Sequence, residues 1–253
     1  MKRSDLLIPA IVFVACSLFL GSSFFVYEPV TGQSNDTYKY RAIHDRDGIG
    51  KFYLGREVEE QPSKVIEALN LQPTDVVADI GAGSGYISFR LAEKVPDGKV
   101  LAVDIQPEML DIIDFLAKEN PDLPVKSVLG SETSSNLSPA SIDLALMIDT
   151  YHEFAYPQEM MESIFQALKP QGRVVLVEYR KENPLIAIKG AHKMTQKQVK
   201  KEMKAIGLQW VTTEEFLPQQ HYMVFEKRAK ENIIESKFGV MNPIGVINRI
   251  MEL

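Results

Sequence analysis

An apolar run that ends near an acid and leads into three closely spaced glycines occupies residues 76–85. Val76–Ile80 has the length and composition of a buried strand, and a helical pattern begins at Tyr86. Between them the glycines stand at alternate positions: Gly81, Gly83 and Gly85. Glycine adopts positive φ angles without strain and lets a ligand approach the main chain closely. The pattern predicts a strand, a tight turn and a helix that bind a nucleotide-like ligand against the backbone.

The spacing of these glycines argues against a nicotinamide cofactor. Dinucleotide-binding enzymes place their third glycine one residue later, where this chain has Tyr86. A second apolar run, Lys99–Asp104, ends in an acid that lies 19 positions after Gly85. An acid at about 20 residues is well placed to accept hydrogen bonds from the ribose of a ligand at the glycine turn.

Three segments of the chain resemble the motifs of the class I S-adenosylmethionine-dependent methyltransferases. They are Asp79–Gly85, Val103–Leu110 and Leu168–Arg173, and the resemblance covers Asp45 to Glu226. Within that family the chain looks similar to a bacterial subgroup that carries a charged, glycine-rich segment like Arg46–Glu57 and a membrane-anchor or signal-like N-terminus.

The resemblance implies S-adenosyl-L-methionine as the cofactor and assigns it a set of binding residues. These are Asp79, Gly81, Gly83, Gly85, Asp104, Ile105, Glu132 and Asp149. The chain departs from the family at one place, because most members carry an Asp after the third strand to receive the adenine amino group. Here Ser131 or Glu132 takes that role, and Glu132 is the stronger acceptor.

The acceptor side of the site is expected after the fourth strand, in Asp149–Phe154. His152 is a candidate general base, because a free imidazole titrates near neutral pH, and Tyr151 is a second catalytic candidate. A purely structural role for His152 remains the alternative. Candidate substrate contacts lie elsewhere in the chain: Tyr53, Arg56, Tyr179 and His192.

Apolar runs alternate with helical patterns along the rest of the chain, which predicts an α/β fold. We expect a Rossmann-like, doubly wound, mostly parallel seven-stranded sheet. The further expected strands are Val125–Leu129, Ile142–Ile148, Arg173–Tyr179, Leu208–Phe216 and His221–Glu226. The expected helices, besides the one after Gly85, are Pro62–Leu69, Glu108–Glu119, Glu159–Leu168 and Gln196–Ile206.

An N-terminal hydrophobic helix precedes this domain. Residues 6–27 carry no charged side chain, and this uncharged run is long enough to cross a bilayer as a helix. A cleaved secretory signal is the alternative, because a basic start and the small residues Gly21, Ser22 and Ser23 flank the run. The expected organisation is an anchor or signal (1–28), a linker and cap (29–61), a methyltransferase domain (62–227) and a C-terminal extension (228–253). The protein is therefore expected to be membrane-associated or exported. The sequence does not decide on which side of the membrane the domain lies.

Composition limits the classes of partner that we expect this protein to bind. A net charge of −6 argues against nucleic acid, whose phosphates require clustered basic residues. The one cysteine, Cys16, lies in the apolar segment, and the four histidines show no ligand spacing along the chain, so we expect no metal. The sequence predicts a methyltransferase for a small-molecule substrate. The alternative is a non-catalytic sensor or interaction protein that binds the same cofactor.

Overall fold

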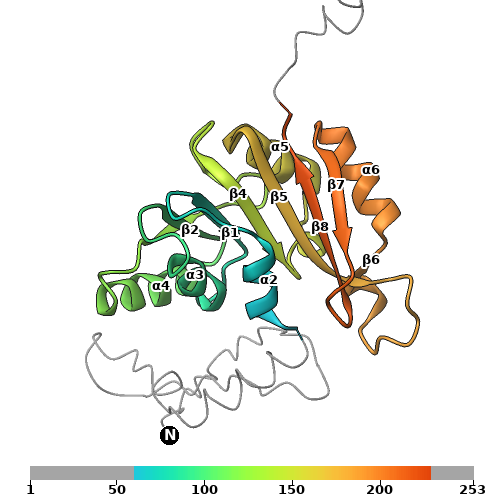
Figure 1. The fold of residues 1–253 in the computed structure, drawn as a ribbon, viewed down its shortest axis with the longest axis horizontal. Coiled ribbons are helices and arrows are strands. Elements are labelled where there is room, and N and C mark those ends of the chain that lie inside the picture. Colours follow the sequence, from blue (N-terminus) through green and yellow to red (C-terminus); the bar gives the residue numbers. More distant parts are fainter. Residues whose placement is uncertain (1–59, 229–253) are drawn as a thin grey trace, which may run out of the picture. The chain divides into compact units, whose positions relative to one another are not determined.

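The computed structural model describes residues 60–228, which form an eight-stranded sheet between two layers of helices (Figure 1). The strands are β1 (Val76–Ile80), β2 (Lys99–Asp104), β3 (Val125–Leu129), β4 (Ile142–Ile148), β5 (Leu168–Arg180), β6 (Lys193–Met194), β7 (Gln209–Glu214) and β8 (Gln220–Glu226). The helices are α2 (Pro62–Ala68), α3 (Tyr86–Ala92), α4 (Pro107–Glu119), α5 (Pro157–Ala167) and α6 (Gln196–Ile206). Two short 3₁₀ turns, η1 (Tyr151–Glu153) and η2 (Gly190–His192), lie in the loops.

The sheet has the strand order β3-β2-β1-β4-β5-β8-β7, with β6 paired to β5 off this path. Strands β1 to β5 are parallel, whereas β8 runs antiparallel to both β5 and β7. The chain winds outward from β1 to β3 and then returns to β4 beside β1, so the strand order reverses between β1 and β4. This arrangement confirms the predicted doubly wound, mostly parallel sheet.

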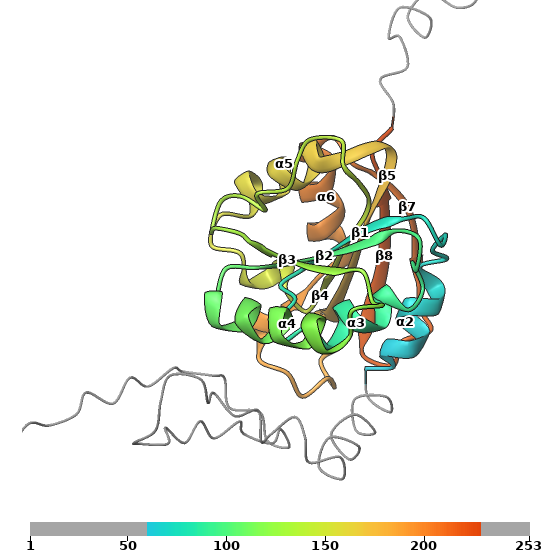
Figure 2. The same ribbon diagram turned by 90° about the vertical axis from the view of Figure 1, so that its left-hand side faces the viewer.

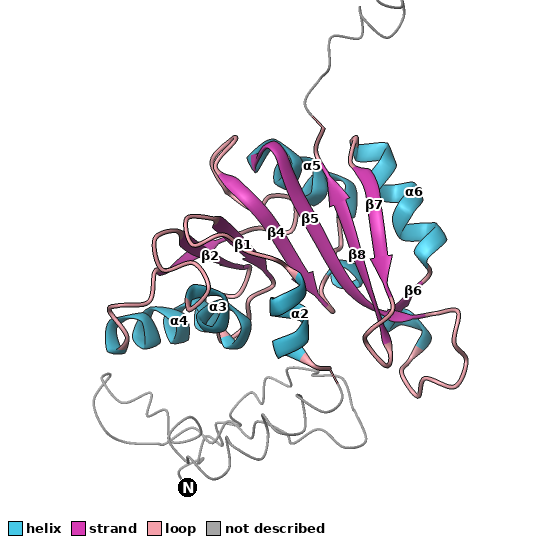
Figure 3. Cartoon of the chain, viewed as in Figure 1, coloured by secondary structure: helices cyan, strands magenta, loops and turns pink. Residues whose placement is uncertain are grey.

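Helices cover both faces of the sheet, with α2, α3 and α4 on one side and α5 and α6 on the other (Figures 2 and 3). Strand β4 shows why its sequence is almost continuously apolar. Ala145 and Met147 pack in the core that contains residues of α5 and α6, while Leu144 and Leu146 pack in the core that contains residues of α2 and α3. A strand buried on both faces needs apolar side chains at every position.

Local sequence signals fix the ends of α6. The Thr195 hydroxyl accepts a hydrogen bond from the Gln198 backbone N–H at 3.1 Å, a cap that typically stabilises a helix by about 1 kcal/mol. The helix ends at Gly207, whose φ of 99° is the left-handed conformation that glycine adopts without strain. The predicted bounds of this helix are confirmed.

Two details of the predicted sheet are wrong. The sheet has eight strands rather than seven, because the two residues of β6 pair with Tyr179 and Arg180 at the end of β5. Two residues are too short to carry a periodic pattern in the sequence. In addition, β5 begins at Leu168 instead of Arg173, since Leu168 already pairs with Ile142 of β4 before an irregularity in the register.

Several predicted features lie outside the described residues: the apolar segment 6–27, the substrate candidates Tyr53 and Arg56, and most of the C-terminal extension. Within residues 60–228, every helix is too short or too polar to span a bilayer.

Candidate active site

Acidic side chains gather where the parallel strands end. Asp79 lies in β1, Asp104 closes β2, Asp149 follows β4 and Glu178 lies near the end of β5. In a doubly wound sheet, ligands bind at this edge beside the reversal of strand order. Burial and a neighbouring carboxylate raise the pKa of Asp79 and of Asp149, and a positively charged ligand would oppose that rise.

The glycine turn between β1 and α3 has the predicted backbone. Gly81, Gly83 and Gly85 have φ angles of 76°, 53° and 87°, all in the left-handed region. A Cβ atom added to Gly81 would overlap the side chain of Thr150, so β1 and the loop after β4 are in close contact there. At Gly83 an added Cβ would meet no atom within 4 Å among the described residues. The turn is therefore packed at Gly81 and open to a ligand at Gly83.

Asp104 fastens this turn. One carboxylate oxygen, Oδ2, accepts the Gly83 backbone N–H at 2.8 Å, and Oδ1 accepts the Gln106 backbone N–H at 2.9 Å. The side chain is 8% exposed. A carboxylate has about four lone-pair positions, so Asp104 keeps the capacity to accept hydroxyl groups of a ligand.

Asp79 is almost fully buried beside the turn, and the Ser88 hydroxyl donates to its Oδ2 at 2.6 Å. Burial raises the pKa of Asp79 to about 6, and the charge of Asp104 contributes in the same direction, while the Ser88 hydrogen bond opposes them. Asp79 therefore titrates close to neutral pH in the folded protein.

Asp149 carries two signs of a ligand-binding position. Its backbone has φ 50°, a conformation that is uncommon outside glycine and that clusters at functional sites. Gln220 donates to Oδ2 at 2.6 Å, but Oδ1 is buried without a hydrogen-bond partner among the described residues. Burial and the charge of Glu178 raise the pKa of Asp149 well above its ordinary value. A buried acceptor without a donor costs about 1–3 kcal/mol, which a bound donor would remove.

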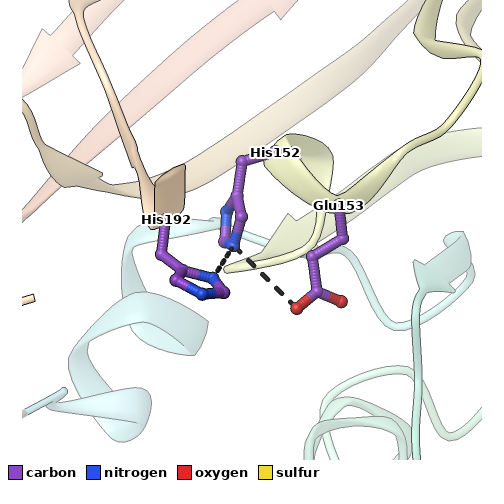
Figure 4. A group of neighbouring side chains, drawn as sticks. All are labelled: His152, Glu153 and His192. Atoms are coloured by element: carbon purple, nitrogen blue, oxygen red, sulfur yellow. Dashed lines mark hydrogen bonds and ion pairs between the residues drawn. The ribbon is translucent and has the colours of Figure 1, made fainter. Parts of the chain in front are cut away.

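Beyond Asp149 lies a pair of imidazole rings backed by a buried acid. His152 Nδ1 lies 2.6 Å from Glu178 Oε2, and His152 Nε2 lies 3.0 Å from His192 Nδ1 (Figure 4). Glu178 is 1% exposed and also accepts the Tyr151 backbone N–H through Oε1 at 2.8 Å. Burial lowers the pKa of His152, but the hydrogen bond and charge of Glu178 outweigh burial and raise it.

Although the histidines show no ligand spacing along the chain, His152 and His192 lie side by side in the structure. They are far apart in the sequence, and the structure explains how they come together. His152 lies in η1 directly after β4, whereas His192 lies in η2, immediately before β6 pairs with Tyr179 at the end of β5. The short strand that the sequence did not reveal is what brings His192 to the site.

The two tyrosine candidates occupy different positions. Tyr151 is 3% exposed, and its hydroxyl donates to Glu202 Oε2 at 2.9 Å. Burial raises the pKa of Tyr151 far above its ordinary value, so its hydroxyl keeps its proton at physiological pH. Tyr179 is half-buried at the end of β5 and lies opposite Lys193 of β6.

The remaining cofactor candidates lie at the ends of β2 and β3. Ile105 follows Asp104 directly and is 50% exposed, and Leu129, which pairs with Asp104, is 52% exposed. Large exposed apolar side chains of this kind suit the face of a planar ring. Glu132 is exposed in the loop after β3.

Sequence reasoning did not assign roles to Glu178, Gln220 or Leu129. Glu178 had a visible signal, because an acid interrupts an otherwise apolar strand, and a buried acid requires a partner. Gln220 and Leu129 gave no such signal, since their roles arise from contacts between distant strands.

Comparison with known proteins identifies the family of this domain. The family described as "Methyltransferase domain" matches residues 71–236, more than half of the chain. An uncharacterized methyltransferase-like protein of Schizosaccharomyces pombe is 35% identical over 107 residues, which cover 42% of this chain and 39% of that protein. A demethylmenaquinone methyltransferase of Chlamydia muridarum is 27% identical over 105 residues, or 42% of this chain and 44% of that protein.

Among solved structures, a SAM-dependent methyltransferase from Aquifex aeolicus has a TM-score of 0.61 at 22% identity. The match covers 66% of this chain and 89% of that one, and it supports the fold. The chain spans about half or less of the length of the curated relatives that it matches.

Proposed function

Since this chain belongs to the methyltransferase-domain family, we propose that it transfers a methyl group from S-adenosyl-L-methionine to a small-molecule acceptor. When bound, this cofactor supplies an electrophilic methyl group on a positively charged sulfur. The protein then has to hold the cofactor, align the acceptor and exclude water.

The residues at the strand ends fit the parts of this cofactor. Asp104 would accept the ribose hydroxyls, and the exposed side chains of Ile105 and Leu129 would pack against adenine. Glu132 would receive the adenine amino group. Asp79 and Asp149 would face the cationic amino acid part of the cofactor, which would favour their charged forms.

The single observation that carries this proposal is the buried Oδ1 of Asp149, which has no donor within residues 60–228 and lies beside a glycine turn that is open at Gly83. An ammonium group bound there would provide both the missing hydrogen bond and a compensating charge.

On the acceptor side, we propose His152 as the catalytic residue, with Tyr179 and His192 as its neighbours at the substrate. Glu178 fixes the ring of His152 and keeps it basic. We assign Tyr151 a positioning role, because its backbone N–H holds Glu178 and its hydroxyl is bound to Glu202. A small molecule is the proposed acceptor because the net charge of −6 disfavours nucleic acid and because a relative methylates demethylmenaquinone, as its name states.

Turnover distinguishes this enzyme from a cofactor-binding sensor. The purified full chain, supplied with S-adenosyl-L-methionine and a metabolite extract, is expected to release S-adenosylhomocysteine. His152→Gln is expected to lower that rate about 10²–10⁴-fold without changing cofactor affinity, the range typical of an acid–base group. Gly83→Arg is the control that blocks cofactor binding. Equal rates for wild type and Gly83→Arg would contradict the proposed activity.

We also propose that residues 6–27 associate the protein with a membrane, as an anchor rather than a cleaved signal. The expected result is that the full chain stays in the membrane pellet after an alkaline wash and keeps its N-terminal mass. Val14→Arg in the middle of this run should release part of the protein from the membrane pellet, since a charge at the centre of a spanning helix costs about 2.5–3.5 kcal/mol. A shortened N-terminus would contradict the anchor and favour export.

A further inference from the structure

The imidazole pair has a third polar neighbour. Glu153 Oε1 lies 4.0 Å from His152 Nε2, and the ligand-type atoms of His152, Glu153 and His192 all lie within 4.8 Å of one another. The rings of His152 and His192 meet nearly at right angles, and Figure 4 shows the Glu153 carboxylate directed toward the same nitrogen of His152 that contacts His192. Two imidazoles and a carboxylate are the ligands found in many catalytic zinc sites.

From this geometry we propose that His152, His192 and Glu153 bind a divalent transition-metal ion, with Zn²⁺ as the best-suited ion. Two nitrogen ligands and one oxygen ligand suit a borderline-soft cation better than Mg²⁺ or Ca²⁺, which prefer oxygen ligands throughout.

The distances allow such a site with small movements. Two nitrogens that each lie about 2.0–2.1 Å from a tetrahedral zinc ion are about 3.3 Å apart, whereas His152 Nε2 and His192 Nδ1 are 3.0 Å apart. The rings therefore need to separate by only about 0.3 Å. The side chain of Glu153 is 63% exposed, so it can rotate to close the longer 4.0 Å gap.

Glu178 supplies the support that metal-bound histidines usually have. It lies 2.6 Å from His152 Nδ1, so the proton of a neutral His152 resides on Nδ1 and the lone pair on Nε2 faces His192. A carboxylate behind a metal-bound imidazole sets this tautomer and strengthens the ligand.

The local charges also favour a dication. Glu178 and Glu153 place two carboxylates beside the imidazole pair, 2.6 Å and 4.0 Å from the two ring nitrogens of His152. A divalent ion would balance the two glutamates. In the contact between His152 Nε2 and His192 Nδ1, one ring nitrogen must donate a hydrogen bond to the other. With the ion bound, both nitrogens would bind the metal instead.

Three protein ligands leave at least one position open on the ion. That position suits an oxygen donor of the methyl acceptor. With the ion bound, the ion would lower the pKa of that oxygen, and without the ion, His152 Nε2 is free to act as the proposed base. This role rests on the proposed function, whereas metal binding itself does not.

Calorimetric titration of the chelator-treated full chain with ZnCl₂ tests the proposal, and Co²⁺ absorption spectra report the ligand set. We expect one tight equivalent, weakened at least tenfold in His192→Gln and several-fold in Glu153→Gln, both of which alter partly exposed side chains. The controls His221→Gln and Glu159→Gln, outside the cluster, should bind as wild type does.

Thermal unfolding gives a second readout. Zn²⁺ should raise the Tm of the wild type and of both control variants, but raise that of His192→Gln less, because only a bound ion stabilises the folded chain. Absence of a Zn²⁺ equivalent, or equal affinity in His192→Gln and wild type, would overturn the site. Titration of the same samples with S-adenosyl-L-methionine separates the two proposals, since cofactor binding without Zn²⁺ binding refutes the metal site alone, and the reverse refutes the proposed function alone.

Discussion

The buried carboxyl group of Asp79 links stability to pH at the scale of one residue. Its pKa is raised from 3.8 in the unfolded chain to about 6 in the folded protein, so the folded form holds the proton more tightly between these values. Stability from this group is therefore greatest at low pH and falls as the pH rises through about 6. Above that pH the buried charge costs about 3 kcal/mol.

Asp79→Asn removes the charge and should therefore gain stability over wild type as the pH rises. The difference in unfolding free energy between variant and wild type should shift by about 2 kcal/mol in favour of Asn from about pH 4.5 to pH 7.5. Urea unfolding at the two pH values measures this shift. Parallel pH profiles for the two proteins would show that Asp79 is not the group that titrates.

At the scale of one element, the glycines of the turn have different roles: Gly81 is required for packing, and Gly83 leaves room for a ligand. Gly81→Ala should destabilise the fold by about 2–4 kcal/mol, because the new methyl group overlaps Thr150 and the backbone is left-handed. Gly83→Ala meets no neighbour and should cost only about 1 kcal/mol for its φ of 53°. Gly190→Ala, with open space and no positive φ, is the neutral control. Chemical unfolding of the three variants gives the ranking, and an unchanged stability in Gly81→Ala would contradict the packing at Thr150.

The individual strands and helices show what the sequence can and cannot reveal. The bounds of β2, β3, β4 and α6 were predicted because the strands are short apolar runs and because α6 has helical spacing behind the capping residue Thr195. The position of Asp104 beside the glycine turn could be inferred from its spacing along the sequence, and its carboxylate accepts the Gly83 N–H. The two-residue strand β6 and its neighbour His192 could not, because they reach the site through pairing with Tyr179 rather than through a local pattern.

Across the described domain, two groups of functional residues lie at different strand ends along one edge of the sheet. The ends of β1 and β2 offer glycine backbone, a buried acid and Asp104, while the ends of β4 and β5 offer His152 backed by Glu178. Asp149, whose Oδ1 has no hydrogen-bond partner among residues 60–228, follows β4, the strand that lies beside β1. In the proposed function, this layout would place cofactor and acceptor side by side, which is what a direct methyl transfer requires.

The cofactor half of this layout carries the central claim, and one titration tests it most directly. Calorimetry of the purified full chain with S-adenosyl-L-methionine should give one binding site, weakened at least tenfold in Asp104→Asn. This change alters the carboxylate that accepts the Gly83 N–H and that we propose to bind the ribose. The same change at the exposed Asp111 should leave affinity unchanged. Absence of binding by folded wild-type protein, or equal affinity in Asp104→Asn and wild type, would contradict the account.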